Sequence, residues 1–119
     1  MKRTINEKLL DNFTKAWYYY CKDNESTITA YPAVPIGKCQ ARYYTVPINK
    51  NTDIYVLQSY DTLVAAIVPY GDTHICLNFM CQAFHFDEFI TGRTTTQHVH
   101  KFMKQMGFSM LYHRIPKGA

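Results

Sequence analysis

The sequence predicts a small α+β protein in which helices pack on one face of an antiparallel sheet. Hydrophobic residues recur at helical spacing near the N-terminus, alternate with polar residues through the middle of the chain, and return to helical spacing near the C-terminus. A length of 119 residues with 47% hydrophobic and 18% charged residues is typical of one folded domain, spanning residues 1–119. The expected order of elements is α-β-β-β-α-β.

The first predicted helix runs from Thr4 to Cys21. Thr4-x-x-Glu7 forms a capping box at its start. Its apolar stripe consists of Ile5, Leu9, Phe13, Ala16, Trp17 and Tyr20. Tyr18 falls on the polar side, so it is either an exposed contact residue for a partner or a tyrosine lying over a neighbouring strand.

A period of two follows an irregular connection that contains Pro32 and Pro35. Val, Ile, Tyr and Thr are frequent here, and turn residues separate three segments, which indicates an antiparallel meander. The predicted strands are Lys38–Ile48, Ile54–Val68 and Thr73–Phe79. Asp61-Thr62 marks a bulge or bend within the middle strand, or divides it into two.

The second predicted helix begins at the capping box Thr94-x-x-Gln97 and ends at Gly107 as a left-handed cap. Its apolar residues, at i, i+3, i+4 and i+7, are Val99, Phe102, Met103 and Met106. A last strand is expected within Phe108–Ile115, where apolar and polar residues alternate.

The histidines and cysteines do not predict a metal site. His98 and His100 lie about 200° apart on a helix, so they cannot grip one ion. A second set of metal-binding residue types matches no common zinc spacing: His74, Cys76, Cys81 and His85. The four cysteines form no C-x-x-C pair and are expected to be reduced core residues, and neither a metal nor a cofactor is predicted.

The second helix also has the features of a binding surface. The start of this helix combines free backbone N–H groups with threonine hydroxyls and the Arg93 guanidinium, a combination that suits the binding of a phosphate or carboxylate group. A capping box alone explains the presence of one of the threonines. Further along, Gln97 and two lysines face outward, which suits nucleic acid phosphates or an acidic protein, or is simply a solvated basic face. The candidate residues are Arg93, Thr95, Thr96, His98, Lys101 and Lys104.

A second candidate surface lies on the strand that begins at Lys38. Arg42 and Tyr44 share one of its faces with Lys38 and Gln40. A basic strand that carries an aromatic side chain is typical of single-stranded nucleic acid binders, and it also resembles an ordinary edge strand.

The sequence contains no enzymatic motif. G-x-S-x-G and a phosphate-binding P-loop are both absent, and no [D/E]-x-K core of a metal-dependent nuclease occurs. No apolar run approaches the roughly 20 residues of a membrane span, and the N-terminus lacks a signal peptide's apolar core, so we expect a cytoplasmic protein without a membrane partner. The formal charge of +4 favours an anionic partner.

Two stretches carry a family resemblance: Ser59-Tyr60-Asp61-Thr62-Leu63-Val64-Ala65 and Thr94-Thr95-Thr96-Gln97-His98. They resemble a family of small proteins of phages, prophages and plasmids of low-GC Gram-positive bacteria, which pair an S-Y-[DN]-T-x-V-A strand with a T-T-x-x-H helix start. Cys81 to Phe89 looks like an insertion between the two. The resemblance implies a phage or mobile-element setting in a bacterial host cell and supplies no mechanism.

The function expected from this setting is binding without catalysis. The partner would be a host protein or ribonucleoprotein complex, such as a nucleic-acid-guided defence nuclease that an anti-CRISPR-like protein inhibits. The alternative is direct binding of DNA or RNA through Arg42, Arg93, Lys101 and Lys104. An enzyme with an unrecognised site is the third reading, and a homodimer through an exposed strand edge is compatible with the pattern.

Overall fold

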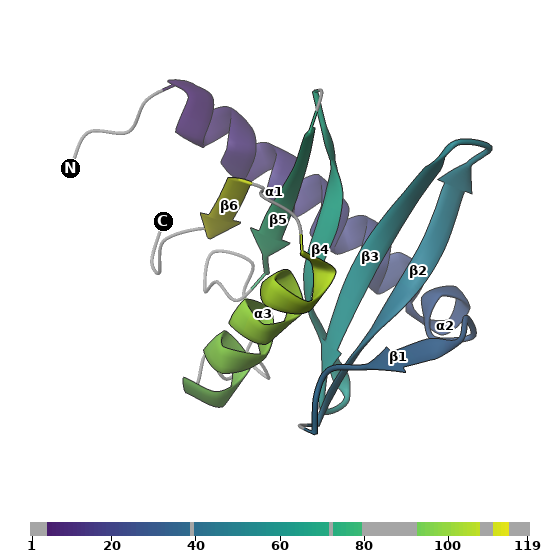
Figure 1. Ribbon diagram of the computed structural model, residues 1–119. Coiled ribbons are helices and arrows are strands. Elements are labelled where there is room, and N and C mark those ends of the chain that lie inside the picture. The colour runs from purple at the N-terminus through teal and green to yellow at the C-terminus, as the bar shows by residue number, and fades with distance from the viewer. Residues whose placement is uncertain (1–4, 39, 72, 80–92, 108–110, 115–119) are drawn as a thin grey trace.

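A twisted sheet with helices on both faces forms the protein in a computed structural model (Figure 1). The structure describes residues 5–38, 40–71, 73–79, 93–107 and 111–114. The helices are α1 (Ile5–Asp23), α2 (Glu25–Ile28) and α3 (Arg93–Met106). The strands are β1 (Ala33–Pro35), β2 (Ala41–Asn49), β3 (Thr52–Ser59), β4 (Thr62–Tyr70), β5 (Thr73–Asn78) and β6 (Leu111–Arg114). The predicted α+β class is confirmed.

The strands follow one another across the sheet in chain order. Neighbours from β1 to β5 are antiparallel, and β6 is parallel to β5. The parallel pair departs from the predicted antiparallel sheet because α3 lies between β5 and β6, and a crossover connection permits parallel pairing. The long middle strand is divided at Tyr60-Asp61, which was one of the predicted alternatives.

One strand was not predicted. β1 pairs with β2 within the segment that was expected to be an irregular connection, with Ala33 opposite Tyr44. Pro35 lies within this strand, and proline is tolerated in an edge strand because its missing N–H can face away from the ladder.

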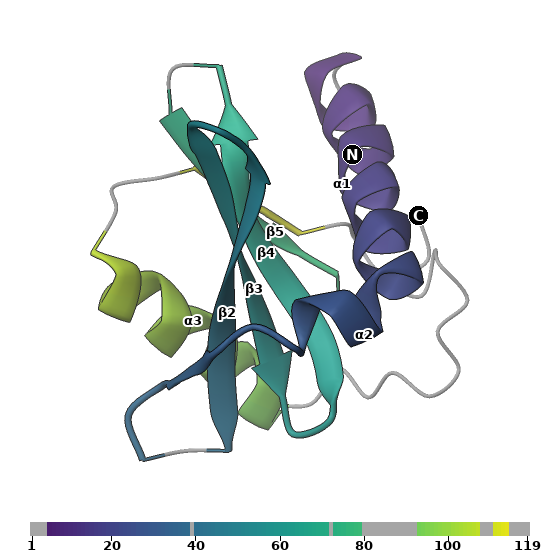
Figure 2. The ribbon, with the colours of Figure 1, turned by 90° about the vertical axis from the view of Figure 1, so that its right-hand side faces the viewer.

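The prediction that both helices pack on one face of the sheet is wrong. Figure 2 shows the sheet between α1 and α3. The two central strands are apolar on both faces: Val56 and Ala66 lie in the core beneath α1, whereas Leu57 and Ala65 lie in the core beneath α3. Each apolar face needs its own cover, so one helix packs on each.

Helix α1 is rotated relative to the prediction, so that only part of its predicted apolar stripe faces the core. Among the α1 side chains that the structure describes, from Leu9 onward, the buried ones are Asp11, Thr14, Tyr18 and Cys21. The Thr14 hydroxyl donates to the Leu10 carbonyl at 2.7 Å, so it is satisfied without water. Tyr18 packs edge-on against Phe79, with ring centroids 5.6 Å apart. Within the predicted apolar stripe, Phe13 and Trp17 pack at the edge of this core, whereas Ala16 and Tyr20 are exposed and Leu9 is 59% exposed.

Helix α3 follows its predicted pattern. Val99 and Phe102 are fully buried, and Met103 and Met106 pack against the same core. The helix begins at Arg93, so Thr94 lies in the first turn and is not the N-cap that the sequence predicted. Gly107 has φ +71° and its N–H donates to the Met103 carbonyl, which confirms the left-handed cap. Within the described ranges, no helix has the length and apolar character that crossing a membrane requires.

Candidate functional site

A buried serine and histidine join strand β3 to helix α3. Ser59 Oγ and His98 Nδ1 are hydrogen-bonded at 2.8 Å. The exposed fraction is 4% for Ser59 and 3% for His98, so water does not compete for this bond. The two stretches that carry the family resemblance therefore meet at one point, although 38 residues of chain lie between these two side chains.

The local sequence explains how the pair forms. Ser59 is the last residue of β3 and lies two positions after Leu57, so the strand alternation directs both side chains to the face that α3 covers. His98 lies four positions before Phe102 and therefore on the same side of the helix as that buried ring. His98 was expected to belong to the binding surface of this helix, but the structure buries it against the sheet.

Burial and the nearby Lys101 charge lower the pKa of His98 below its ordinary 6.5. Both causes act against the imidazolium, because burial removes its hydration and the ammonium repels a second positive charge. The ring is therefore neutral at pH 7, with one ring nitrogen as donor and the other as acceptor. A neutral His98 imidazole can form the observed hydrogen bond with the uncharged Ser59 hydroxyl.

Tyr60 lies over this pair in a strained backbone conformation. Its φ is +55°, and it is the one non-glycine residue with a positive φ in the part of the chain that the structure describes. Its side chain is 55% exposed, and its ring is tilted 39° against the His98 imidazole at a centroid distance of 5.8 Å. Strained residues of this kind persist where surrounding bonds hold them, and they concentrate at functional sites.

Hydrogen bonds to both polar groups of its backbone hold Tyr60 in place. Its N–H donates to the Gln40 carbonyl at 2.9 Å, and its carbonyl accepts from Arg42 Nη2 at 3.2 Å. Both partners belong to the segment that leads into and forms the start of β2. The neighbouring strand therefore fixes the position from which the exposed ring projects.

The predicted nucleic-acid surface on β2 is used internally. Tyr44 is 4% exposed, and its hydroxyl donates to Gln58 Oε1. The half-buried Arg42 donates from Nε to the same oxygen at 3.1 Å. Tyr44 is therefore not available to stack on a base, and the pairing of β2 with β1 also excludes the edge-strand reading.

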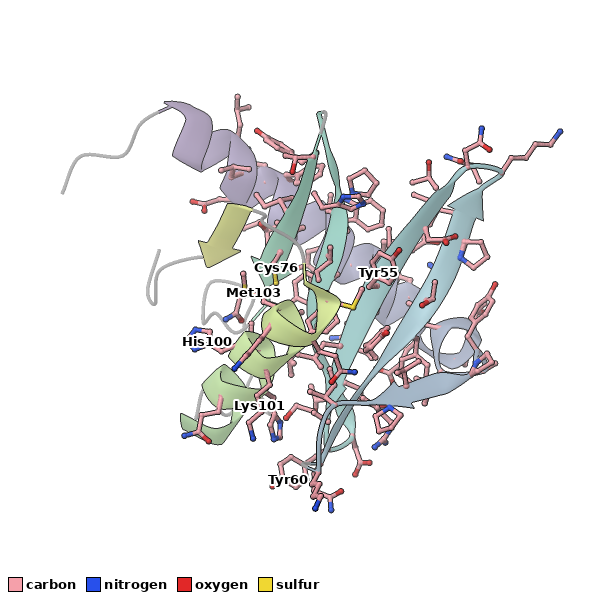
Figure 3. All side chains as sticks on the ribbon, viewed as in Figure 1. Tyr55, Tyr60, Cys76, His100, Lys101 and Met103 are labelled. Atoms are coloured by element: carbon pink, nitrogen blue, oxygen red, sulfur yellow. The ribbon has the colours of Figure 1, made fainter. Side chains whose placement is uncertain are left out.

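The outward face of α3 continues from Tyr60. Figure 3 shows Tyr60 at the end of the sheet, with Lys101 and His100 on α3. Gln97, His100, Lys101 and Lys104 are exposed, as predicted for Gln97 and the two lysines, and α3 contains no acidic residue. We refer to Tyr60, Gln97, His100, Lys101 and Lys104 as the Tyr60–α3 surface.

Tyr18 does not belong to this surface, and three other predicted site residues have no described side chain. Arg93, Thr95 and Thr96 lie in the first turns of α3, but their side chains are outside the described part of the structure. Tyr18 is 7% exposed, so the reading of Tyr18 as an exposed anchor is wrong, and its packing against Phe79 explains why.

The Ser59–His98 pair has the spacing of a nucleophile and its general base. Its burial keeps solvent and substrate from the serine, so in this conformation the pair fastens α3 to the sheet. Among the described residues, no group of three or more His, Cys, Asp or Glu side chains is placed to hold a metal ion. Cys81 and His85 of the second metal hypothesis are outside the described residues, and Cys76 is buried.

Sequence reasoning missed Ser59 and Tyr60 as site residues. A serine at a strand end and a tyrosine in a turn carry no chemical motif by themselves. The signal was available in the S-Y-D-T stretch, where Ser59-Tyr60 precedes the two turn-forming residues of the predicted bend. Only the pairing of β3 with α3 shows which histidine the serine meets.

Fold and site together define a small α+β protein whose sheet end carries a buried Ser–His pair beneath an exposed tyrosine. The chain belongs to a family of unknown function (DUF8033), which matches residues 31–116. The matched region contains the Ser59–His98 pair and the whole Tyr60–α3 surface, and α1 lies outside it. No curated protein and no solved structure matches the chain.

Proposed function

We propose that this protein is a non-enzymatic binding protein that engages an acidic surface of a host macromolecular complex through the Tyr60–α3 surface. The observation that carries the proposal is the placement of Tyr60. Bonds to Gln40 and Arg42 hold this exposed aromatic residue in a strained backbone conformation, beside a cationic helix that the Ser59–His98 contact joins to the sheet.

Tyr60 has the properties of an interface anchor. Tyrosine offers a large, stiff and amphipathic contact area, and tyrosines are frequent among the residues that dominate binding energy. Its backbone is fixed by Gln40 and Arg42, and its ring rests on His98, so little conformational freedom remains to be lost on binding.

The charges beside Tyr60 favour an acidic partner. Lys101 and Lys104 are exposed on a helix without acidic residues, and the chain carries a formal charge of +4. Positive charges at the rim of an interface raise the association rate with a negatively charged partner more than they raise the final affinity.

The resemblance to small phage, prophage and plasmid proteins supports the biological setting of the proposal. In that setting the partner is a protein or ribonucleoprotein complex in the cytoplasm of a bacterial host, and a nucleic-acid-guided defence nuclease fits the charge requirement. Absence of catalysis is part of the proposal, and the burial of Ser59 and His98 supports it.

Direct binding of DNA or RNA is the second candidate. The exposed lysines of α3 favour it, since phosphate contacts need free cationic side chains. The internal hydrogen bonds of Arg42 and the burial of Tyr44 weaken it, because β2 no longer supplies a stacking surface.

Retention from a lysate of a low-GC Gram-positive host tests both candidates. Tagged wild-type protein is compared with Tyr60→Asn and with Lys101→Gln/Lys104→Gln, with and without nuclease treatment. The proposal predicts that a host protein is still retained after nuclease treatment. Tyr60→Asn should lower the amount of this host protein at least about tenfold. Retention of nucleic acid alone, lost on digestion and on lysine substitution, would replace the proposal by the second candidate.

A further inference from the structure

The Arg42 guanidinium has no acidic partner among the described residues. It donates from Nε to Gln58 Oε1 at 3.1 Å and to the Tyr44 hydroxyl at 3.3 Å, and from Nη2 to the Tyr60 carbonyl at 3.2 Å. All three acceptors are uncharged. The exposed Asp61, which follows Tyr60, makes no ion pair with Arg42. A half-buried charge without a counter-ion is costly, so this position favours an incoming anion.

One end of this guanidinium remains available to a ligand. Arginine has five N–H donors in a planar fork, and the three bonds use the N–H of Nε and one of the two on Nη2. Within the part of the chain that the structure describes, Nη1 donates to no acceptor. Nη1 and the second N–H of Nη2 form a parallel pair of donors that matches the two oxygens of a carboxylate. The bond to the Tyr60 carbonyl is solvent-exposed, so this end of the side chain is accessible.

The internal bonds also hold the guanidinium in one position. Its Nε is anchored on two buried side chains, Tyr44 and Gln58. A side chain that is already ordered loses little freedom when a ligand binds. Arg42 reaches the Tyr60 backbone from β2, whereas the Tyr60 ring contacts His98 on α3. The free end of Arg42 therefore extends the Tyr60–α3 surface onto β2.

We propose that Arg42 is the carboxylate-binding residue of the Tyr60–α3 surface and that its guanidinium receives an aspartate or glutamate of the partner protein next to Tyr60. The identity of the partner rests on the proposed function, whereas the anion site rests on the surroundings of Arg42. Tyrosine and arginine are frequent among the residues that dominate binding energy. A phosphate of nucleic acid matches the same donors, but the burial of Tyr44 leaves β2 without a ring on which a base can stack. A carboxylate is therefore favoured.

An NMR titration of the full chain with a capped hexaglutamate peptide tests the site without the host partner. The side-chain N–H resonances of Arg42 and the backbone N–H resonance of Tyr60 should shift and then saturate. Arg42→Lys keeps the charge but loses the paired donors, so it should raise the dissociation constant at least about fivefold. Lys50→Gln removes a charge from the exposed turn at the far end of β2 and should raise the constant less than about twofold.

The two variants separate a defined site from attraction by net charge. Net charge alone predicts the opposite order, with Lys50→Gln weaker than Arg42→Lys, and that order would overturn the inference. Circular dichroism establishes that Arg42→Lys is folded. If it is not, the wild-type titration decides, because Arg42 resonances that do not shift and saturate would overturn the site. Tighter binding of a thymidine oligonucleotide of the same charge would also overturn the assignment to a carboxylate.

The retention assay distinguishes failure of this inference from failure of the proposed function. Arg42→Lys should lower the amount of retained host protein at least about fivefold. Saturable shifts at Arg42 without a host protein retained by wild type would support the anion site and contradict the proposed function. A host protein retained equally by wild type and Arg42→Lys would overturn the inference and leave the proposed function in place.

Discussion

Ser59 Oγ lies 2.8 Å from His98 Nδ1, and this bond is the polar link between the end of β3 and the buried side of α3. It is formed between two side chains that are each less than 5% exposed. Tyr60, the next residue after Ser59, is thereby placed beside the cationic face of the helix. The proposed binding surface combines this contact with the hydrogen bonds of Tyr60 to Gln40 and Arg42.

Ser59→Ala should destabilise the protein by about 1–3 kcal/mol, because it leaves a buried ring nitrogen of His98 without its partner. Urea unfolding followed by circular dichroism measures the change. Ser26→Ala, at an exposed serine of α2, is the matched control and should remain within about 0.5 kcal/mol of wild type. Equal effects of the two substitutions would contradict a stabilising Ser59–His98 bond.

His98 should make the protein less stable as the pH falls below 6.5. Its pKa is lowered in the folded protein, so the unfolded chain takes up a proton near pH 6.5 while the folded chain does not, and the free energy of unfolding decreases until the folded pKa is reached. Above about pH 7 this contribution is constant.

Urea unfolding between pH 7.5 and pH 5 measures this dependence. His98→Asn should flatten the slope, whereas His100→Asn, which removes an exposed imidazole from the same helix, should retain it. A slope that is the same in wild type and His98→Asn would show that His98 is not its source.

Tyr60→Asn should separate stability from binding. Asparagine tolerates a left-handed φ better than tyrosine, so stability should stay the same or rise by up to about 1 kcal/mol, even though the ring contact with His98 is lost. Partner affinity should fall at least about tenfold. Thermal unfolding together with the retention assay measures both, and a large loss of stability would mean that the ring serves the fold.

Cys21 and Cys76 should resist alkylation in the folded protein. Burial raises the pKa of each thiol to about 12, so almost no thiolate exists at pH 8, and the sulfur atoms are covered. Iodoacetamide treatment followed by peptide mass spectrometry should modify both only after urea is added. Rapid labelling of either residue without urea would show that its surroundings open.

The sequence predicted the elements better than their placement. The spacing of Val99, Phe102, Met103 and Met106 correctly located the buried side of α3, because all its apolar residues meet one sheet face. The same reasoning was only partly right for α1, where Phe13 and Trp17 pack against the core as predicted, but Tyr18 and Cys21 also pack inward and Leu9 remains outside. Periodicity identifies a stripe, but tertiary packing decides which side of a mixed helix is covered.

Only part of the candidate site could be predicted from the sequence, for a similar reason. Lys101 and Lys104 could be predicted as exposed because they lie opposite the apolar stripe. Arg42 and Tyr44 were predicted to form a binding surface, but both donate to Gln58 on the neighbouring strand. Cross-strand hydrogen bonds cannot be predicted from the periodicity of either strand.

The most direct test of the proposed binding surface is photo-cross-linking in host cells. A photoreactive amino acid replaces Gln97 on the Tyr60–α3 surface or, in the control, exposed Asn51, which lies in the turn before β3 at the far end of that strand from Tyr60. We predict a specific host product from position 97 that is lost in the Tyr60→Asn background and is absent from position 51. The absence of a product from position 97, or identical products from both positions, would contradict the proposal.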